Sequence, residues 1–136
     1  MGRKVYNKLV RSEIPTIIKE SGRECIYAKL KLDDNREEII KLLKEKLVEE
    51  ANEVVEAIHR GDILEEMGDL IDVYNELKYI LEGPHGRDIT TIRDAKAIQK
   101  GTFCFKIDSN GNRQSLQGSG DLTYYKLIAV DDGKKD

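Results

Sequence analysis

The sequence predicts a mainly α-helical protein, a helical bundle whose apolar surface favours dimerisation, with a small C-terminal β-hairpin. Apolar residues recur every three or four positions in three segments between residues 33 and 100, which is the period of helices that bury one side. After Gly101 the pattern changes to short apolar runs near an Asn110-Gly111 turn, which is typical of a hairpin. A chain of 136 residues is long enough for one core.

The first helix is expected to be short. Ser12 is a good N-cap, Pro15 is tolerated in a first turn, and Gly22 should end the helix. Residues 25–32 follow it and are expected to be extended or a loop, because their apolar residues alternate irregularly.

The next helix should be long. Asp33 or Asp34 would cap it, and it should end near Arg60 and Gly61. At about 100° per residue, one side of this helix is apolar. The members of that stripe are Ile40, Leu43, Leu47, Ala51, Val54 and Ile58.

The helix after it is expected to start at Asp62, where Glu65 three residues later resembles a capping box. It should run to about Leu81, before a Gly83-Pro84 stop. Its apolar stripe consists of Ile63, Met67, Leu70, Tyr74, Leu77 and Leu81, and Tyr74 is expected in the core.

The remaining elements are shorter. The pattern predicts a helix over 88–100, one strand over 102–107 and a second strand over 124–130. The polar, glycine-rich stretch 114–120 should be a loose loop, and 131–136 a frayed tail.

Four carboxylates on the two long helices are spaced so that they can meet. Glu50 and Glu53 are three residues apart, as are Glu66 and Asp69, so each pair shares one helix surface. Antiparallel packing would bring both pairs to one level. Glu66 lies inside an apolar stripe, where a charge is costly unless it is paired or binds a metal. Ligands that are all oxygen suit Mg²⁺ or Mn²⁺.

Other acidic residues nearby fit a solvated helix surface. The helical wheel turns Glu49 and Glu56 away from the apolar stripe, and Glu65 needs no other explanation.

Basic residues could bind the phosphates of a substrate beside such a cation. Lys8 and Arg11 lie close together before the first helix, and Lys96 and Lys100 are four apart on one side of a later helix. A cation at the carboxylates would neutralise a polyphosphate and lower the pKa of a bound water, making it a nucleophile. Each basic pair alone is also a common surface feature.

Composition excludes several classes of partner. A net charge of −3 gives no basic surface for a nucleic-acid duplex. No apolar run is long enough to span a membrane, and no signal-peptide core follows residues 1–4. Cys25 and Cys104 are isolated and indicate no disulfide framework. The sequence predicts a soluble, cytoplasmic protein.

Two competing chemistries fit poorly. A di-iron bundle needs Glu-x-x-His on its helices, and neither His59 nor His85 places an imidazole beside the acidic residues. The chain also has no phosphate-binding Gly-x-x-x-x-Gly-Lys loop.

The acidic pattern Glu49-Glu50-x-x-Glu53, then Glu66-x-x-Asp69, resembles the signature of MazG-like all-α nucleoside triphosphate pyrophosphohydrolases. Residues 6–15 resemble the start of a subgroup related to phosphoribosyl-ATP pyrophosphohydrolase, and 96–103 resemble its closing motif. Two departures are Ser12, where that subgroup has Asp, and Lys100-Gly101-Thr102-Phe103, where it has Arg-Gly-Gly-Phe. The resemblance predicts a domain over 1–107 and an extension over 108–136.

This resemblance implies a Mg²⁺-dependent enzyme that splits nucleoside triphosphates into a monophosphate and pyrophosphate. It implies a homodimer, or a homotetramer made of two dimers. Glu50, Glu53, Glu66 and Asp69 would be metal ligands, and Glu49 would orient or deprotonate the attacking water. The helical wheel instead makes Glu49 a surface residue, so two interpretations of it stand.

Two other functions remain open. One is a phosphoribosyl-ATP pyrophosphohydrolase, which the metal ligands do not distinguish from a general nucleotide hydrolase. The other is a catalytically silent nucleotide-binding or assembly protein. A carboxylate kept in an apolar stripe, Glu66, argues against a silent site. Homodimers are favoured independently by apolar residues that flank the stripes, namely Val48, Val55, Ile71 and Ile80.

Overall fold

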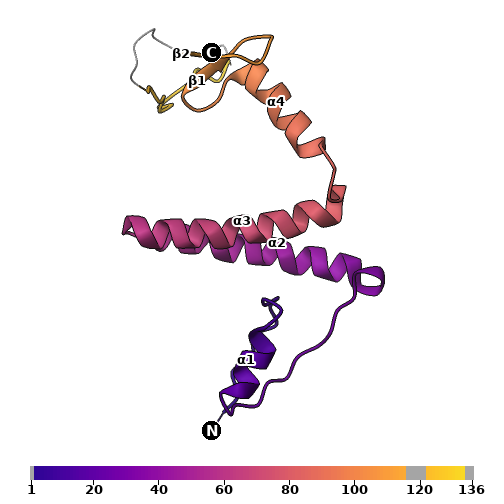
Figure 1. Ribbon diagram of the computed structural model, residues 1–136. Coiled ribbons are helices and arrows are strands. Elements are labelled where there is room, and N and C mark those ends of the chain that lie inside the picture. Colours follow the sequence, from indigo (N-terminus) through magenta and orange to yellow (C-terminus); the bar gives the residue numbers. More distant parts are fainter. Residues whose placement is uncertain (1, 116–121, 134–136) are drawn as a thin grey trace. The chain divides into compact units, whose positions relative to one another are not determined.

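The computed structural model describes residues 2–115 and 122–133, which form four helices and two short strands (Figure 1). The chain divides into two compact units, Met1–Pro84 and His85–Asp136, and each is described by itself. The predicted, mainly helical fold class is confirmed. None of the helices in the described ranges has the length and apolar character to span a membrane. The division into 1–107 and 108–136 stays a prediction.

Helix α1 covers Ile14–Glu20, and its start differs from the prediction. Ser12 is not the N-cap: Glu13 holds that position, and no side chain caps the helix. The end is as expected, because Gly22 has a φ of 84° and the amides of Gly22 and Arg23 donate back into the last turn. That pair of hydrogen bonds is a Schellman motif, which needs a residue tolerant of positive φ.

Helix α2 covers Leu32–Glu56 and begins before its predicted caps. Lys31 is the N-cap, while Asp33 and Asp34 lie in the first turn, where their charges complement the helix dipole. The helix is kinked at Asn35, which has non-helical φ and ψ of −125° and 28°. The Asn35 Oδ1 accepts a hydrogen bond from the Lys31 amide at 3.1 Å, so this side chain satisfies the amide of the N-cap residue.

The connection between α2 and α3 lies earlier in the sequence than predicted. Helix α2 ends at Glu56 because Ala57 leaves the helical region with a ψ of 137°. Helix α3, Arg60–Glu82, follows with His59 as its N-cap. Asp62 lies in the first turn of α3 and is not a cap, so the predicted capping box is wrong. A connection of 57–59 is enough for two helices that pack side by side.

Helices α2 and α3 lie antiparallel against each other and form the core of the first unit (Figure 1). Leu43, 3% exposed, is the one buried apolar residue among the described residues. Tyr74 is 39% exposed, so its predicted place in the core is wrong for this chain. Two helices can cover only one side of each other, and apolar residues such as Val48 and Val55 therefore stay exposed.

The predicted ends of the later helices are confirmed. Helix α3 stops before Gly83, which has a φ of 77°. Helix α4, Asp88–Lys100, has the predicted bounds and stops before Gly101, with a φ of 78°. A glycine at positive φ ends both helices because it carries no Cβ to clash.

The second unit contains a small antiparallel hairpin after α4. Strand β1, Phe105–Ile107, pairs with β2, Arg113–Ser115, with Ile107 opposite Arg113. The turn between them is held by the Asp108 carboxylate, whose Oδ1 accepts the amides of Asn110 and Asn112 at 2.9 and 2.8 Å. The predicted turn is confirmed.

The predicted second strand is wrong. Among the described residues, 124–130 contain no strand, and β1 pairs instead with the residues directly after its turn. The short turn places β2 directly opposite β1, so β1 has a pairing partner without the more distant residues 124–130. The predicted loop 114–120 therefore begins inside β2. Residues 116–120 of it, and 134–136 of the predicted tail, lie outside the described residues.

Candidate metal centre

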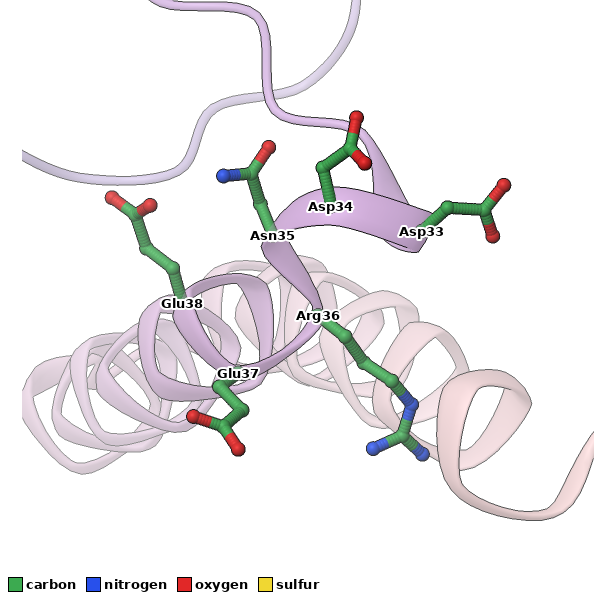
Figure 2. A pocket seen from close by; sticks show the side chains of 6 residues that line it. All are labelled: Asp33, Asp34, Asn35, Arg36, Glu37 and Glu38. Carbon is green, nitrogen blue, oxygen red and sulfur yellow. The ribbon is translucent and has the colours of Figure 1, made fainter.

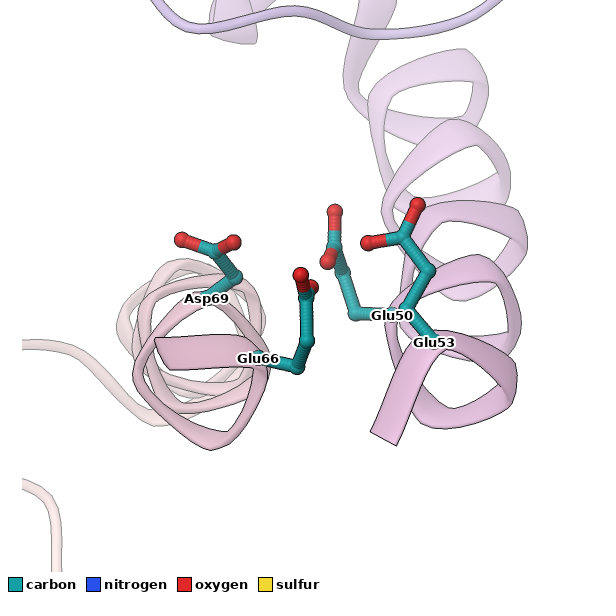
Figure 3. Close-up of side chains that lie close together, drawn as sticks. All are labelled: Glu50, Glu53, Glu66 and Asp69. Carbon is teal, nitrogen blue, oxygen red and sulfur yellow. The ribbon is translucent and has the colours of Figure 1, made fainter. Parts of the chain in front are cut away.

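The four predicted carboxylates meet between α2 and α3. Glu50 and Glu53 from α2 and Glu66 and Asp69 from α3 each offer one oxygen, and these oxygens all lie within 4.8 Å of one another. Figure 3 shows Glu50, Glu53 and Glu66 extending toward the space between the two helices, with Asp69 beside them on α3. The three-residue spacing on each helix and the antiparallel packing together produce this convergence.

Two members of the cluster carry buried oxygens without a hydrogen bond. Glu50 is only 6% exposed. Within the described residues its Oε2 has no hydrogen-bond partner, and neither does the buried Oε2 of Glu66. A buried acceptor without a partner is costly. A hard cation would satisfy both oxygens, so the residues present fit a Mg²⁺ or Mn²⁺ ion.

Crowding of the carboxylates changes their acidity. Burial raises the pKa of Glu50, and the neighbouring carboxyl of Glu53 raises it further. The pKa of Glu53 is also raised, chiefly because its carboxyl hydrogen-bonds with that of Glu66. The Glu50 shift thus comes first from burial and the Glu53 shift from a neighbouring carboxyl, and a divalent cation would offset both costs.

The segment before α1 brings two of its basic side chains, those of Lys8 and Arg11, to the carboxylates in and beside this cluster. Arg11 Nη2 lies 2.8 Å from Asp69 Oδ1 and 2.9 Å from Asp72 Oδ2. Hydrogen bonds to Asp72 and Asp69 raise the pKa of Arg11. Lys8 Nζ lies 3.2 Å from Glu49 Oε1. Both basic side chains thus lie at the site, where they form ion pairs with carboxylates of the same chain.

Glu49 lies beside the cluster but is not one of its four members. Its side chain is 35% exposed, with Oε1 bonded to Lys8 and Oε2 bonded to Lys46. Burial would raise the pKa of Glu49, but the hydrogen bonds from Lys46 and Lys8 outweigh burial and lower it. Glu49 is therefore a paired carboxylate rather than the freely solvated residue that the helical wheel suggests. Glu56 is exposed, as predicted.

Two residues at the site were not found from the sequence. Lys46 bonds Glu49 at 3.1 Å and lies 3.5 Å from Glu50, and Asp72 shares Arg11 with Asp69. Their spacing could have indicated these contacts, because residues three or four apart on a helix are neighbours. Many surface pairs share that spacing, so it does not single these residues out.

The other predicted basic pair belongs to the second unit. Lys96 and Lys100 lie on α4, four residues apart and both exposed. Their role in binding substrate stays a prediction.

A surface hollow at the start of α2 is separate from the cluster. It is lined by residues 33–38, whose side chains spread around the kink at Asn35 (Figure 2). Glu38, the nearest of these in sequence, lies roughly 18 Å along the helix from Glu50. This hollow therefore contributes nothing to the carboxylate site.

Comparison with known proteins agrees with the geometry. Residues 39–94 match the MazG nucleotide pyrophosphohydrolase domain, a range that contains all four clustered carboxylates and Glu49. Searches of curated proteins and of solved structures gave no match. Residues 39–94 thus resemble a MazG nucleotide pyrophosphohydrolase domain, which is consistent with a MazG-like family.

Proposed function

We propose that the chain hydrolyses nucleoside triphosphates to a monophosphate and pyrophosphate, with Mg²⁺ as cofactor and Mn²⁺ as a substitute. Glu50, Glu53, Glu66 and Asp69 would hold the cation. The observation that carries the proposal is the convergence of four carboxylate oxygens within 4.8 Å inside a matched pyrophosphohydrolase domain. When bound, the cation would neutralise phosphate charge and lower the pKa of a bound water.

Glu49 supplies a base in this proposal. It stands outside the four-carboxylate cluster, and two lysines favour its ionised form. An ionised carboxylate beside the cluster can orient an attacking water and accept its proton.

Lys8 and Arg11 are proposed to bind the phosphates. Their present partners are carboxylates, and their side chains are 39% and 60% exposed. Exposed ion pairs contribute only about 0–1 kcal/mol to stability. The phosphates of a substrate can therefore compete for both side chains, with Lys96 and Lys100 as proposed additional contacts.

A homodimer, or a tetramer of two dimers, is proposed as the working form. Apolar side chains on α2 and α3 that a two-helix core leaves exposed support it, among them Val48, Val55 and Ile71. Light scattering should give twice the chain mass at micromolar concentration. A stable, fully active monomer would contradict this part of the proposal.

The direct test is release of pyrophosphate from a panel of nucleotides, with and without Mg²⁺. We expect metal-dependent release that Glu53→Gln abolishes and Glu56→Gln preserves, because Glu56 is exposed outside the cluster. Preferential cleavage of phosphoribosyl-ATP would instead assign the chain to that related activity. Nucleotide binding without pyrophosphate release from any member of the panel would indicate a silent binding protein and refute the proposal.

A further inference from the structure

Lys46 has an environment unlike that of an ordinary helix-surface lysine. It is 19% exposed and lies one turn before Glu49 and Glu50, with its Nζ 3.1 Å from Glu49 Oε2 and 3.5 Å from Glu50 Oε1. On the same helix, Lys41 makes an i,i+4 pair with Glu45 at 3.9 Å and is 76% exposed. Lys41 is thus an internal reference for what such a pair does at the surface.

The contact with Glu50 gives the two oxygens of this buried carboxylate different surroundings. Lys46 faces Oε1, whereas Oε2 is buried without a hydrogen-bond partner among the described residues. A buried carboxylate needs an opposite charge to remain ionised at low cost. Lys46 supplies that charge from one side and leaves the other oxygen available.

The contact with Glu49 has a different consequence. With Lys46 on Oε2 and Lys8 on Oε1, both oxygens of Glu49 are held by ammonium groups. Glu49 is adjacent in sequence to Glu50 and yet is absent from the set of converging oxygens. Its two lysine partners hold Glu49 in that separate position.

We infer that Lys46 is a positioning residue of the metal centre: it orients Glu50 with one oxygen free for a cation and holds Glu49 outside the ligand set. This inference rests on the proposed function. Without the Lys46 charge, Glu50 and Glu49 are both free to turn toward the cation, and one repelling positive charge is lost.

The test uses the full chain and Mn²⁺ as the probe, with titration calorimetry as the readout. Lys46→Met keeps an unbranched apolar stem but removes the charge, and Lys46→Arg keeps the charge. We expect Lys46→Met to bind Mn²⁺ roughly tenfold more tightly, because like charges a few ångströms apart repel even near a surface. Metal-free Lys46→Met should melt at a lower temperature, and its kcat should fall because Glu49 is no longer held.

Controls separate this role from simple packing. Lys41→Met should leave Mn²⁺ affinity, melting temperature and kcat unchanged, and Lys46→Arg should restore values near those of the wild type. Packing loss alone would not tighten metal binding. Unchanged or weaker Mn²⁺ binding by Lys46→Met, in a background where the wild type binds Mn²⁺ and releases pyrophosphate, would overturn the inference and leave the proposed function intact. Absence of both activities in the wild type would refute the proposed function itself.

A second measurement needs no charge-removing variant. Lysines of the wild-type protein can be labelled with ¹³C-methyl groups, and the Lys46 resonance can be assigned by its loss in Lys46→Arg. Titration with Mg²⁺ should shift the Lys46 resonance and leave that of Lys41 in place. A Lys46 resonance that does not respond to Mg²⁺ would refute the inference even if Lys46→Met failed to fold.

Discussion

Glu66 shows how one residue can carry a structural cost for the sake of a site. Its buried Oε2 has no hydrogen-bond partner in the described part of the chain, although its helix could have placed an apolar residue there. We expect Glu66→Gln to abolish hydrolysis and to stabilise the metal-free protein by about 1 kcal/mol, because a neutral amide is cheaper to bury than a charge. Thermal unfolding without metal and the pyrophosphate assay measure the two effects. The four-carboxylate site would be wrong if this variant kept full Mg²⁺-dependent activity.

Glu49 is a solvated surface residue by the helical wheel, but in the structure it is paired with Lys8 and Lys46 beside the carboxylate cluster. We expect Glu49→Gln to lower kcat by roughly 10²- to 10⁴-fold, the range for a positioned general base, and to leave Mn²⁺ affinity close to that of the wild type. Steady-state kinetics and calorimetry separate these quantities. Wild-type rates would make Glu49 only a partner of Lys8 and Lys46.

The candidate ligands could be predicted from the sequence because their geometry is set by the backbone. Residues three apart share a helix surface whatever their rotamers, and this was enough to find Glu50, Glu53, Glu66 and Asp69. The contacts of Lys46 with Glu49 and Glu50 depend on long side chains that have many rotamers. Pattern alone does not select among those rotamers.

At the scale of elements, the presence of each helix was predictable, but the exact starts of α1, α2 and α3 were not. The glycines that end α3 and α4 at positive φ are a strong local signal. The N-termini lack that signal, since none of the four helices in the described ranges has a side-chain hydrogen bond from its N-cap residue. The misplaced strand at 124–130 has a related cause, because apolar, β-prone composition does not say which segment β1 will meet.

The kink in α2 offers a test at this scale. Asn35→Ala removes the oxygen that accepts the Lys31 amide. We expect a loss of about 1 kcal/mol in the free energy of unfolding, similar to the loss of a helix cap, with activity unchanged because the kink is far along α2 from Glu50. Urea unfolding and the pyrophosphate assay measure these. A large fall in activity at unchanged stability would show that the start of α2 takes part in the site.

The whole molecule should respond to pH through its crowded carboxylates. The pKa values of Glu50 and Glu53 are raised above the ordinary value of 4.5, so the folded state binds more protons than the unfolded state above that pH. Their contribution to stability is present below pH 4.5 and is lost as pH rises through the raised values. The lowered pKa of Glu49 has the opposite effect. Its contribution to stability is present above pH 4.5 and is lost as the pH falls below that value.

Metal-free melting temperatures should therefore fall as pH rises from about 4.5 toward neutrality. Millimolar Mg²⁺ should reverse that fall, because binding to the native state alone stabilises it, by about 2.7 kcal/mol at a hundred times Kd. Glu53→Gln should flatten the metal-free curve and weaken the Mg²⁺ response. Melting temperatures that are the same with and without Mg²⁺ at every pH would contradict a preformed cation site.

The short connection at 57–59 also sets an order of events during folding. Local helical hairpins form early, because closing a short loop costs little entropy. The four carboxylates are thus expected to converge before the opening segment arrives, since Lys8 and Arg11 lie 41 and 58 residues from their partners. Lys46 is the counter-ion present from the start, on the same helix. Stopped-flow refolding should accordingly be faster with Mg²⁺ and slower in Lys46→Met, with Arg11→Gln affecting mainly the unfolding rate.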